Sequence, residues 1–318
     1  MTILWCGGEG IDFSGSPVAS TNTDYKRNDF ARCSLYKDAI FSSYPFPGGE
    51  ITSGWVSGRV WTQPLTSSTY NSNIFGLTDS SGKGLWLKKA SGYLSLLLYD
   101  GTTWATLQTS ASVLFNTGNI DKLDIQLTSY GASANVKVYF NDTLVIDYTG
   151  DISISGVTGF ACVAGYGKSG AAAISELIAA DEDTRLMSLK TLAPVAAGDS
   201  SEWTNDYTSI DEVTNSDADT VFTETASQNF QCNLTGMPIG DYIVKAVKVA
   251  ARMTDGVGGM GVKQGIKTNS TLALSDTITL GGVWETHEQM YQNNPVTSNR
   301  FTPAEIEALQ LAFQSAAV

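Results

Sequence analysis

The feature that most constrains this chain is a series of short segments in which apolar and polar residues alternate, bounded by turn-forming residues. In residues 123–128, Leu123, Ile125 and Leu127 alternate with Asp124 and two further polar residues. Because successive side chains of a strand point to opposite faces, this pattern predicts a strand with one buried face and one solvated face. A chain made of such segments buries its apolar faces by pairing strands into sheets.

Turn residues between these segments predict antiparallel hairpins over residues 54–165. The turns that mark them most clearly are residues 79–82 (Asp-Ser-Ser-Gly), Asn141-Asp142 and above all Asp100-Gly101. On the strand after Asp100-Gly101, Trp104 and Leu107 are the residues expected to pack in the core. Many antiparallel strands in one domain leave a sandwich or a closed barrel open. The strands expected around these turns cover residues 74–78, 84–88, 93–99, 103–109, 134–140, 143–148 and 157–164.

A change of composition near residue 190 predicts a second domain. The chain has 318 residues, more than one hydrophobic core usually serves. Pro194 opens an acidic stretch that is typical of a domain crossing. We therefore expect a β-sandwich over residues 1–190 and a smaller β domain over residues 191–318. Within the latter, residues 241–253 form the clearest strand, and a glycine-rich turn is expected to pair it with residues 261–267.

The last segment changes to a helical period and carries a strong helix start. A threonine at the N-cap, a proline at the first helical position and a glutamate three residues after the cap form a capping box. Apolar residues at helical spacing follow, so the domain is expected to end in one short helix. The residues expected to build it are Thr302, Pro303, Glu305, Ile306, Leu309 and Phe313.

Two stretches of the first domain are similar to a known protein family. Residues 4–13 (LWCGGEGIDF), followed by the predicted strands, resemble the opening of concanavalin-like (LamG-type) jelly-roll proteins of tailed bacteriophages. Residues 174–185 (ISELIAADEDTR), with Leu192-Ala193-Pro194 and Trp203 after them, resemble the junction segment of that family. Together with a third stretch near the C-terminus, the similarity covers nearly the whole chain.

The third stretch resembles the C-terminal ending of the same family. Residues 291–297 lead into residues 301–306, where the family has an Asp/Asn-Pro-x-Thr-Gly turn, a tryptophan and a capped helix. Ser298 replaces the usual glycine and Phe301 the usual tryptophan, which weakens the match. The resemblance implies a virion structural protein with a lectin-like jelly-roll domain and no catalytic residues. It leaves open whether the copies sit on the tail or on the capsid.

Charge and composition exclude several classes of function. A net charge of −13 with no basic stripe disfavours binding to nucleic acid. The longest apolar run, residues 94–99, is too short to span a bilayer, so we expect a soluble protein assembled into the virion in the host cytoplasm. The sole histidine, His287, has no metal-binding partner nearby in the sequence, and the cysteines show no CxxC pair. We therefore expect no enzyme activity, cofactor or transition-metal site.

Carbohydrate binding requires an aromatic face for stacking and polar loop groups, sometimes fixed by calcium. The ligand-binding candidates are Trp55, Trp61, Asp79, Asn141 and Asp142. Core packing for the tryptophans and ordinary turn roles for the others are the competing interpretation, and a calcium site remains an alternative.

A glycosidase needs two carboxylates that face one groove. The nearest candidates, Asp181 and Asp183, lie in an acidic run that reads as a solvated turn, which disfavours this function. The leading hypothesis is a surface protein of the phage particle, associated with the tail and attached to host-surface polysaccharide. In this hypothesis the domain over residues 191–318 docks on the particle and contacts sister chains, while the lectin-like sandwich faces outward toward the host. Cyclic homo-oligomers and contacts with other phage structural proteins follow from it. A capsid decoration protein without a ligand and a polysaccharide depolymerase are the alternatives.

Overall fold

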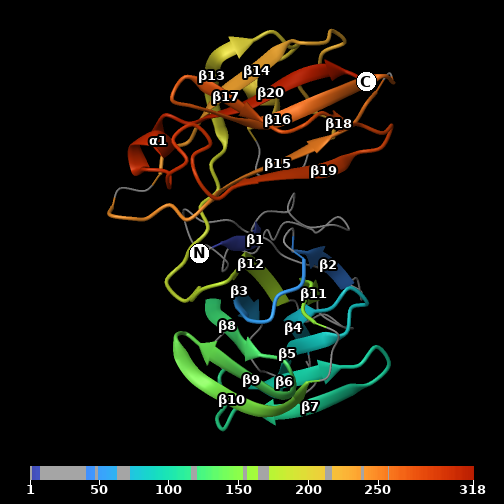
Figure 1. The fold of residues 1–318 in the computed structure, drawn as a ribbon, viewed down its shortest axis with the longest axis vertical. Helices are drawn as coiled ribbons and strands as arrows, with labels where there is room; N and C mark the ends of the chain where they lie inside the picture. The colour runs from blue at the N-terminus through green and yellow to red at the C-terminus, as the bar shows by residue number, and fades with distance from the viewer. Residues whose placement is uncertain are drawn as a thin grey trace. The chain divides into compact units, whose positions relative to one another are not determined.

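The computed structural model describes residues 2–7, 41–46, 49–62, 72–115, 120–152, 156–163, 172–211, 217–237, 240–256 and 258–318. The chain divides into two compact units, Met1–Leu189 and Lys190–Val318. Figure 1 shows that strands dominate both units. The expectation of an all-β chain with a jelly-roll-type sandwich and one short helix near the C-terminus is confirmed.

The described residues of the first unit form two six-stranded antiparallel sheets (Figure 1). Sheet A has the spatial order β1 (Ile3–Gly7), β12 (Ala172–Ala180), β3 (Gly54–Thr62), β8 (Ile120–Ser129), β9 (Gly131–Phe140) and β10 (Thr143–Ile152). Sheet B has the order β2 (Phe41–Pro45), β11 (Gly159–Val163), β4 (Ser72–Thr78), β5 (Gly84–Ala90), β6 (Tyr93–Tyr99) and β7 (Trp104–Thr109).

Local turns explain the hairpins of both sheets. β4 to β7 pair in chain order in sheet B, and β8 to β10 do the same in sheet A. Asn141 and Asp142 have φ angles of 47° and 65° between β9 and β10, as a tight hairpin turn with the right twist requires. The predicted hairpins around 79–82, 100–101 and 141–142 are confirmed.

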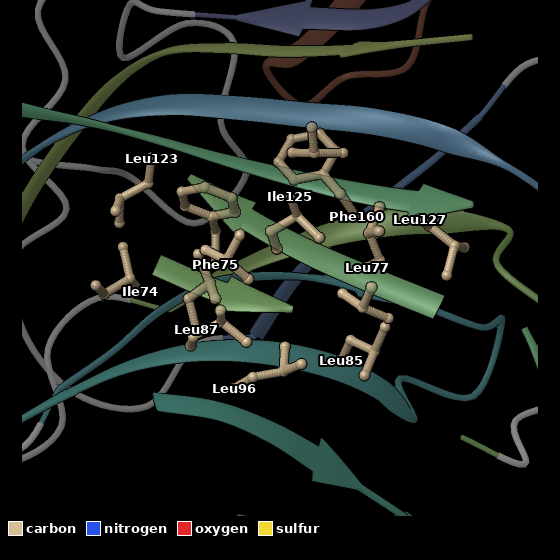
Figure 2. Close-up of a cluster of buried hydrophobic side chains, with 14 of the residues drawn as sticks. Ile74, Phe75, Leu77, Leu85, Leu87, Leu96, Leu123, Ile125, Leu127 and Phe160 are labelled. Atoms are coloured by element: carbon tan, nitrogen blue, oxygen red, sulfur yellow. The ribbon is translucent and has the colours of Figure 1, made fainter. Parts of the chain in front are cut away.

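One hydrophobic core holds the two sheets together. Leu123, Ile125 and Leu127 of β8 are buried, and Figure 2 shows them pointing toward apolar side chains of sheet B such as Phe75 and Leu87. Burying each such side chain contributes about 1.5–3 kcal/mol. The outward face of sheet A therefore carries the alternate residues of β3, β8 and β9, among them Trp55, Asp124 and Tyr139.

The second unit is built around another antiparallel sheet. Its order is β13 (Pro194–Ser201), β14 (Asn229–Leu234), β20 (Gln310–Ala317), β16 (Met260–Thr268) and β17 (Thr271–Leu274), with β18 (Ile278–Thr279) also paired with β16. β15 (Val247–Met253) and β19 (Glu285–Tyr291) form a separate two-stranded sheet. The remaining described elements are the 3-10 helix η2 (Tyr207–Ser209) and the helix α1 (Pro303–Glu307).

Two expectations for this unit are wrong. The strand predicted over 241–253 begins only at Val247, and it pairs with β19 rather than with residues 261–267. Residues 261–267 lie in β16, whose partners are β17, β18 and β20. A glycine-rich turn therefore joins β15 to β16 without making them hydrogen-bonded neighbours.

The predicted helix start is present, but the helix is shorter than expected. Thr302 accepts a hydrogen bond from the backbone N–H of Glu305, the Glu305 carboxylate accepts one from the backbone N–H of Thr302, and Pro303 is the first helical residue. The helix ends at Glu307, so Leu309 lies beyond it and Phe313 lies in β20. Ile306 and Leu309 still pack in one apolar cluster of the unit, and Phe313 packs in another.

Candidate functional site

Trp55 does not present a vacant aromatic face. Its ring stacks on Tyr139 with a centroid distance of 5.6 Å and an interplanar angle of 23°. The guanidinium carbon of Arg185 lies 5.3 Å from the Trp55 ring centroid and 4.6 Å from that of Tyr139. The Arg185 guanidinium therefore covers the aromatic rings on which a sugar would stack. Trp61 also lies in β3, but its side chain is outside the part of the structure that is described.

The three predicted loop ligands have turn roles. The Asp79 carboxylate accepts hydrogen bonds from Ser81 and from the backbone N–H of Lys83, and it is buried. The Asn141 side chain accepts from the backbone N–H of Lys122 and donates to Asp121 at 2.9 Å. Asp142 is exposed in the same turn. Within the described residues, no three His, Cys, Asp or Glu side chains gather as a metal ion would require.

A buried polar cluster lies on the outward face of sheet A. Asp124 is fully buried, although the alternation in β8 predicted a solvated position, and that prediction is wrong. Thr184 Oγ1 donates to Asp124 Oδ1 at 3.1 Å, and Lys122 Nζ lies 3.8 Å from the same oxygen. Burial raises the pKa of Asp124 to about 6, against the opposing effects of Lys122 and Thr184. Residues 181–189, which contain Thr184, exclude water from this position.

The two carboxylates considered for glycoside cleavage are engaged elsewhere. Asp181 Oδ1 accepts a hydrogen bond from the backbone N–H of Thr2 at 2.8 Å. Asp183 forms a two-pronged ion pair with Arg185, with the shorter contact at 2.6 Å. This pairing lowers the pKa of Asp183, whereas a carboxyl group that acts as a general acid needs a raised pKa. The geometry supports a structural role for both residues.

An exposed aromatic surface lies instead on the outward face of sheet B. Trp104, the first residue of β7, is 39% exposed, although it was expected to pack in the core. Its ring stacks on Tyr99 with centroids 4.4 Å apart, and it forms a T-shaped pair with the fully buried Trp86 at a centroid distance of 5.7 Å. Leu107 is partly buried against the core, as expected. We call Tyr99, Trp104 and the underlying Trp86 the Trp104 platform.

The β6–β7 turn fixes the Trp104 platform. Tyr99 and Trp104 are directly opposite partners in the two strands. Between them, Asp100 accepts hydrogen bonds from the backbone N–H groups of Thr102 and Thr103 and from the Thr103 hydroxyl. The backbone bond from Thr103 is the largest of several causes that lower the pKa of Asp100 to about 2. The platform is therefore bordered by an exposed carboxylate that stays ionised at ordinary pH.

The sequence predicts the β6–β7 turn but not the Trp104 platform that this turn builds. An Asp-Gly turn flanked by Tyr99 and Trp104 places the two aromatic residues opposite each other, and this spacing was the available signal. The sequence gives no local sign of the Arg185 contact, because its partners in β3 and β9 are distant in sequence.

His287 lies in β19 with Nε2 3.9 Å from Glu285. No helix among the described residues has the length and apolar character needed to cross a membrane.

Comparison with known proteins gives structural neighbours only. No protein-family model matches the sequence, and no curated protein matches it. Among solved structures, alginate lyase Aly36B is 13% identical, with 55% of this chain and 92% of that chain covered and a TM-score of 0.39. The carbohydrate-binding module CBM66 from Bacillus subtilis is 9% identical, covering 52% and 87%, with a TM-score of 0.31. A tetrameric galectin from the sponge Cinachyrella sp. is 16% identical, covering 43% and 97%, with a TM-score of 0.33. At these values no activity or ligand carries over to this chain.

Proposed function

We propose that the protein is a non-enzymatic structural protein of a tailed-bacteriophage particle, exposed at its surface, associated with the tail, and attached to host-surface glycans through the Trp104 platform. The observation that carries the glycan part is the exposure of Trp104 on a rigid support. An exposed indole ring offers a flat apolar face to a pyranose ring, and adjoining loop groups supply hydrogen bonds. The sequence resemblance supports the assignment to a virion.

Weak sugar sites suffice if the protein is displayed in several copies. Linking sites on one particle raises avidity by about 10²–10⁴ without any new contact. We therefore propose a homo-oligomer with cyclic symmetry that contacts other structural proteins of the phage. The engagement of Asp181 and Asp183 in contacts within the chain supports a binding role over a cleaving one.

A glycan array probed with the full chain tests the binding role. The Trp104→Ala variant is expected to lose most of the signal, since stacking on the platform would be removed. Tyr93→Ala is the matched control, because Tyr93 lies on the outward face of the same sheet and is 37% exposed. Equal binding by wild type and Trp104→Ala would contradict the role of the platform.

Immunogold labelling of intact particles tests the location. Gold on the tail supports the proposal, whereas gold distributed over the head indicates a decoration protein. Absence of array binding, together with particles that burst more easily when the protein is missing, would replace the attachment role by decoration.

A further inference from the structure

Residues 181–189 run across the outward face of sheet A as a strap. The strap contacts three neighbouring strands: Arg185 lies over Trp55 of β3 and Tyr139 of β9, and Thr184 contacts Asp124 of β8. Thr184 and Asp124 are both fully buried. An outward sheet face is open to water unless something covers it, so the strap is the cover here.

Polar contacts hold the strap at this point. Lys122 Nζ donates to the carbonyl oxygen of Thr184 at 3.1 Å and also to that of Arg185. Thr184 Oγ1 donates to Asp124, and the Arg185 guanidinium stacks on the two aromatic rings. The next residue, Leu186, is 96% exposed and contributes no apolar anchor. Each polar contact makes a modest net contribution, so the closed state is sensitive to a single group.

The contact with Asp124 is incomplete. Oδ1 accepts a hydrogen bond from the hydroxyl of Thr184, but Oδ2 is buried without a hydrogen-bond partner among the described residues. A buried carboxylate oxygen without a partner is costly in the charged form and much less so when the group is protonated. The closed strap therefore favours the protonated acid.

We propose that residues 181–189 are a detachable strap that is held closed over sheet A at acidic pH and opens increasingly toward neutral pH. Opening would uncover Trp55, Tyr139, Lys122 and Asp124 together as a second aromatic and polar surface. This inference does not depend on the Trp104 platform.

The direction of the pH effect follows from linkage. The pKa of Asp124 is about 6 in the closed state and returns toward 3.8 when opening admits water. The closed state binds the proton more tightly, so closure is favoured below pH 6 and weakens as pH rises through that value. With these two values, the ratio of closed to open strap falls about tenfold between pH 5 and pH 8.

The other charged groups around the cluster act on this balance without reversing it. Lys122 lowers the pKa of Asp124, whereas Asp142 and Asp183 raise it, and all three effects are smaller than that of burial. Burial lowers the pKa of Lys122 from 10.5. The charged groups that face the pair from the surrounding elements are Arg59 of β3, Asp142 of the β9–β10 turn, Glu176 of β12, and Asp183 and Arg185 of the strap.

Hydrogen exchange of the full chain at pH 5 and pH 8 tests the proposal. The informative amides are those of Arg185, bonded to Asp183, and Met187, bonded to the carbonyl of Thr184. Protection factors remove the intrinsic pH dependence of exchange. We expect protection in the strap to be about tenfold lower at pH 8, while β8 stays protected at both values.

Two variants show whether the pH dependence of strap protection comes from protonation of Asp124 or from other groups. Asp124→Asn keeps the shape but stays neutral, so strap protection should no longer depend on pH. Asp147→Asn, which changes an exposed carboxylate on the same sheet, should behave like the wild type. An identical pH response in wild type and Asp124→Asn would overturn the proposal. So would a strap that exchanges only with global unfolding or that is unprotected at both pH values.

Discussion

The carboxyl group of Asp124 lies beside Lys122 and under Thr184, and its burial raises its pKa from 3.8 to about 6. A raised pKa for an acid means that the folded state holds the proton more tightly than the unfolded state. The stabilising effect of that proton is complete below pH 3.8 and is lost as the pH rises through 6. The folded protein therefore carries a destabilising charge here at neutral pH.

Replacing Asp124 by Asn should remove this pH dependence. Between pH 5 and pH 8 the wild type is expected to lose about 1.4 kcal/mol of unfolding free energy through Asp124, which corresponds to the tenfold change in proton binding. Urea unfolding of both proteins at the two pH values measures this difference. A loss of the same size in Asp124→Asn would assign it to other groups.

Helix α1 shows how a local signal can locate the start of an element without fixing its end. The capping box of Thr302 and Glu305 needs only four consecutive residues, so the sequence predicts it well. The end depends on tertiary structure, because β20 is inserted between β14 and β16. Because this strand is buried on both faces, residues 310–317 do not alternate strictly between apolar and polar. Leu309 and Phe313 therefore match a helical spacing by chance.

Removing the cap should destabilise the second unit. Thr302→Ala loses the side-chain acceptor for the backbone N–H of Glu305, and we expect a cost of about 1 kcal/mol. Thr279→Ala, at an exposed threonine of the same unit, serves as the control. Thermal unfolding of the three proteins gives the comparison, and a Thr302→Ala variant that melts with the wild type would mean that the cap contributes nothing.

The same distinction explains which hairpins were predicted. The turns at 79–82, 100–101 and 141–142 each join neighbouring strands, so their residues carry the pairing information. β15 pairs with β19 across a long sequence separation, and no local residue marks that choice. The candidate site divides in the same way: the Asp100 turn was recognised, whereas the exposure of Trp104 and the stacking of Arg185 on Trp55 depend on how distant elements pack.

Taken as one object, the chain combines a jelly-roll-type sandwich with a second β unit, and each unit has its own hydrophobic clusters. An exposed indole on a rigid sheet and acidic side chains held in internal contacts suit a protein that adheres to a polymer without breaking it. The proposed role as a multicopy phage surface protein uses both units, one for glycan contact and one for docking on the particle.

The most direct measurement follows binding and cleavage in one experiment. Purified host-surface polysaccharide is incubated with the full chain, and bound protein and newly formed chain ends are determined from the same samples. The account predicts saturable binding that depends on Trp104, with no new chain ends over time. Accumulating chain ends, reduced when both Asp181 and Asp183 are replaced by Asn, would contradict it.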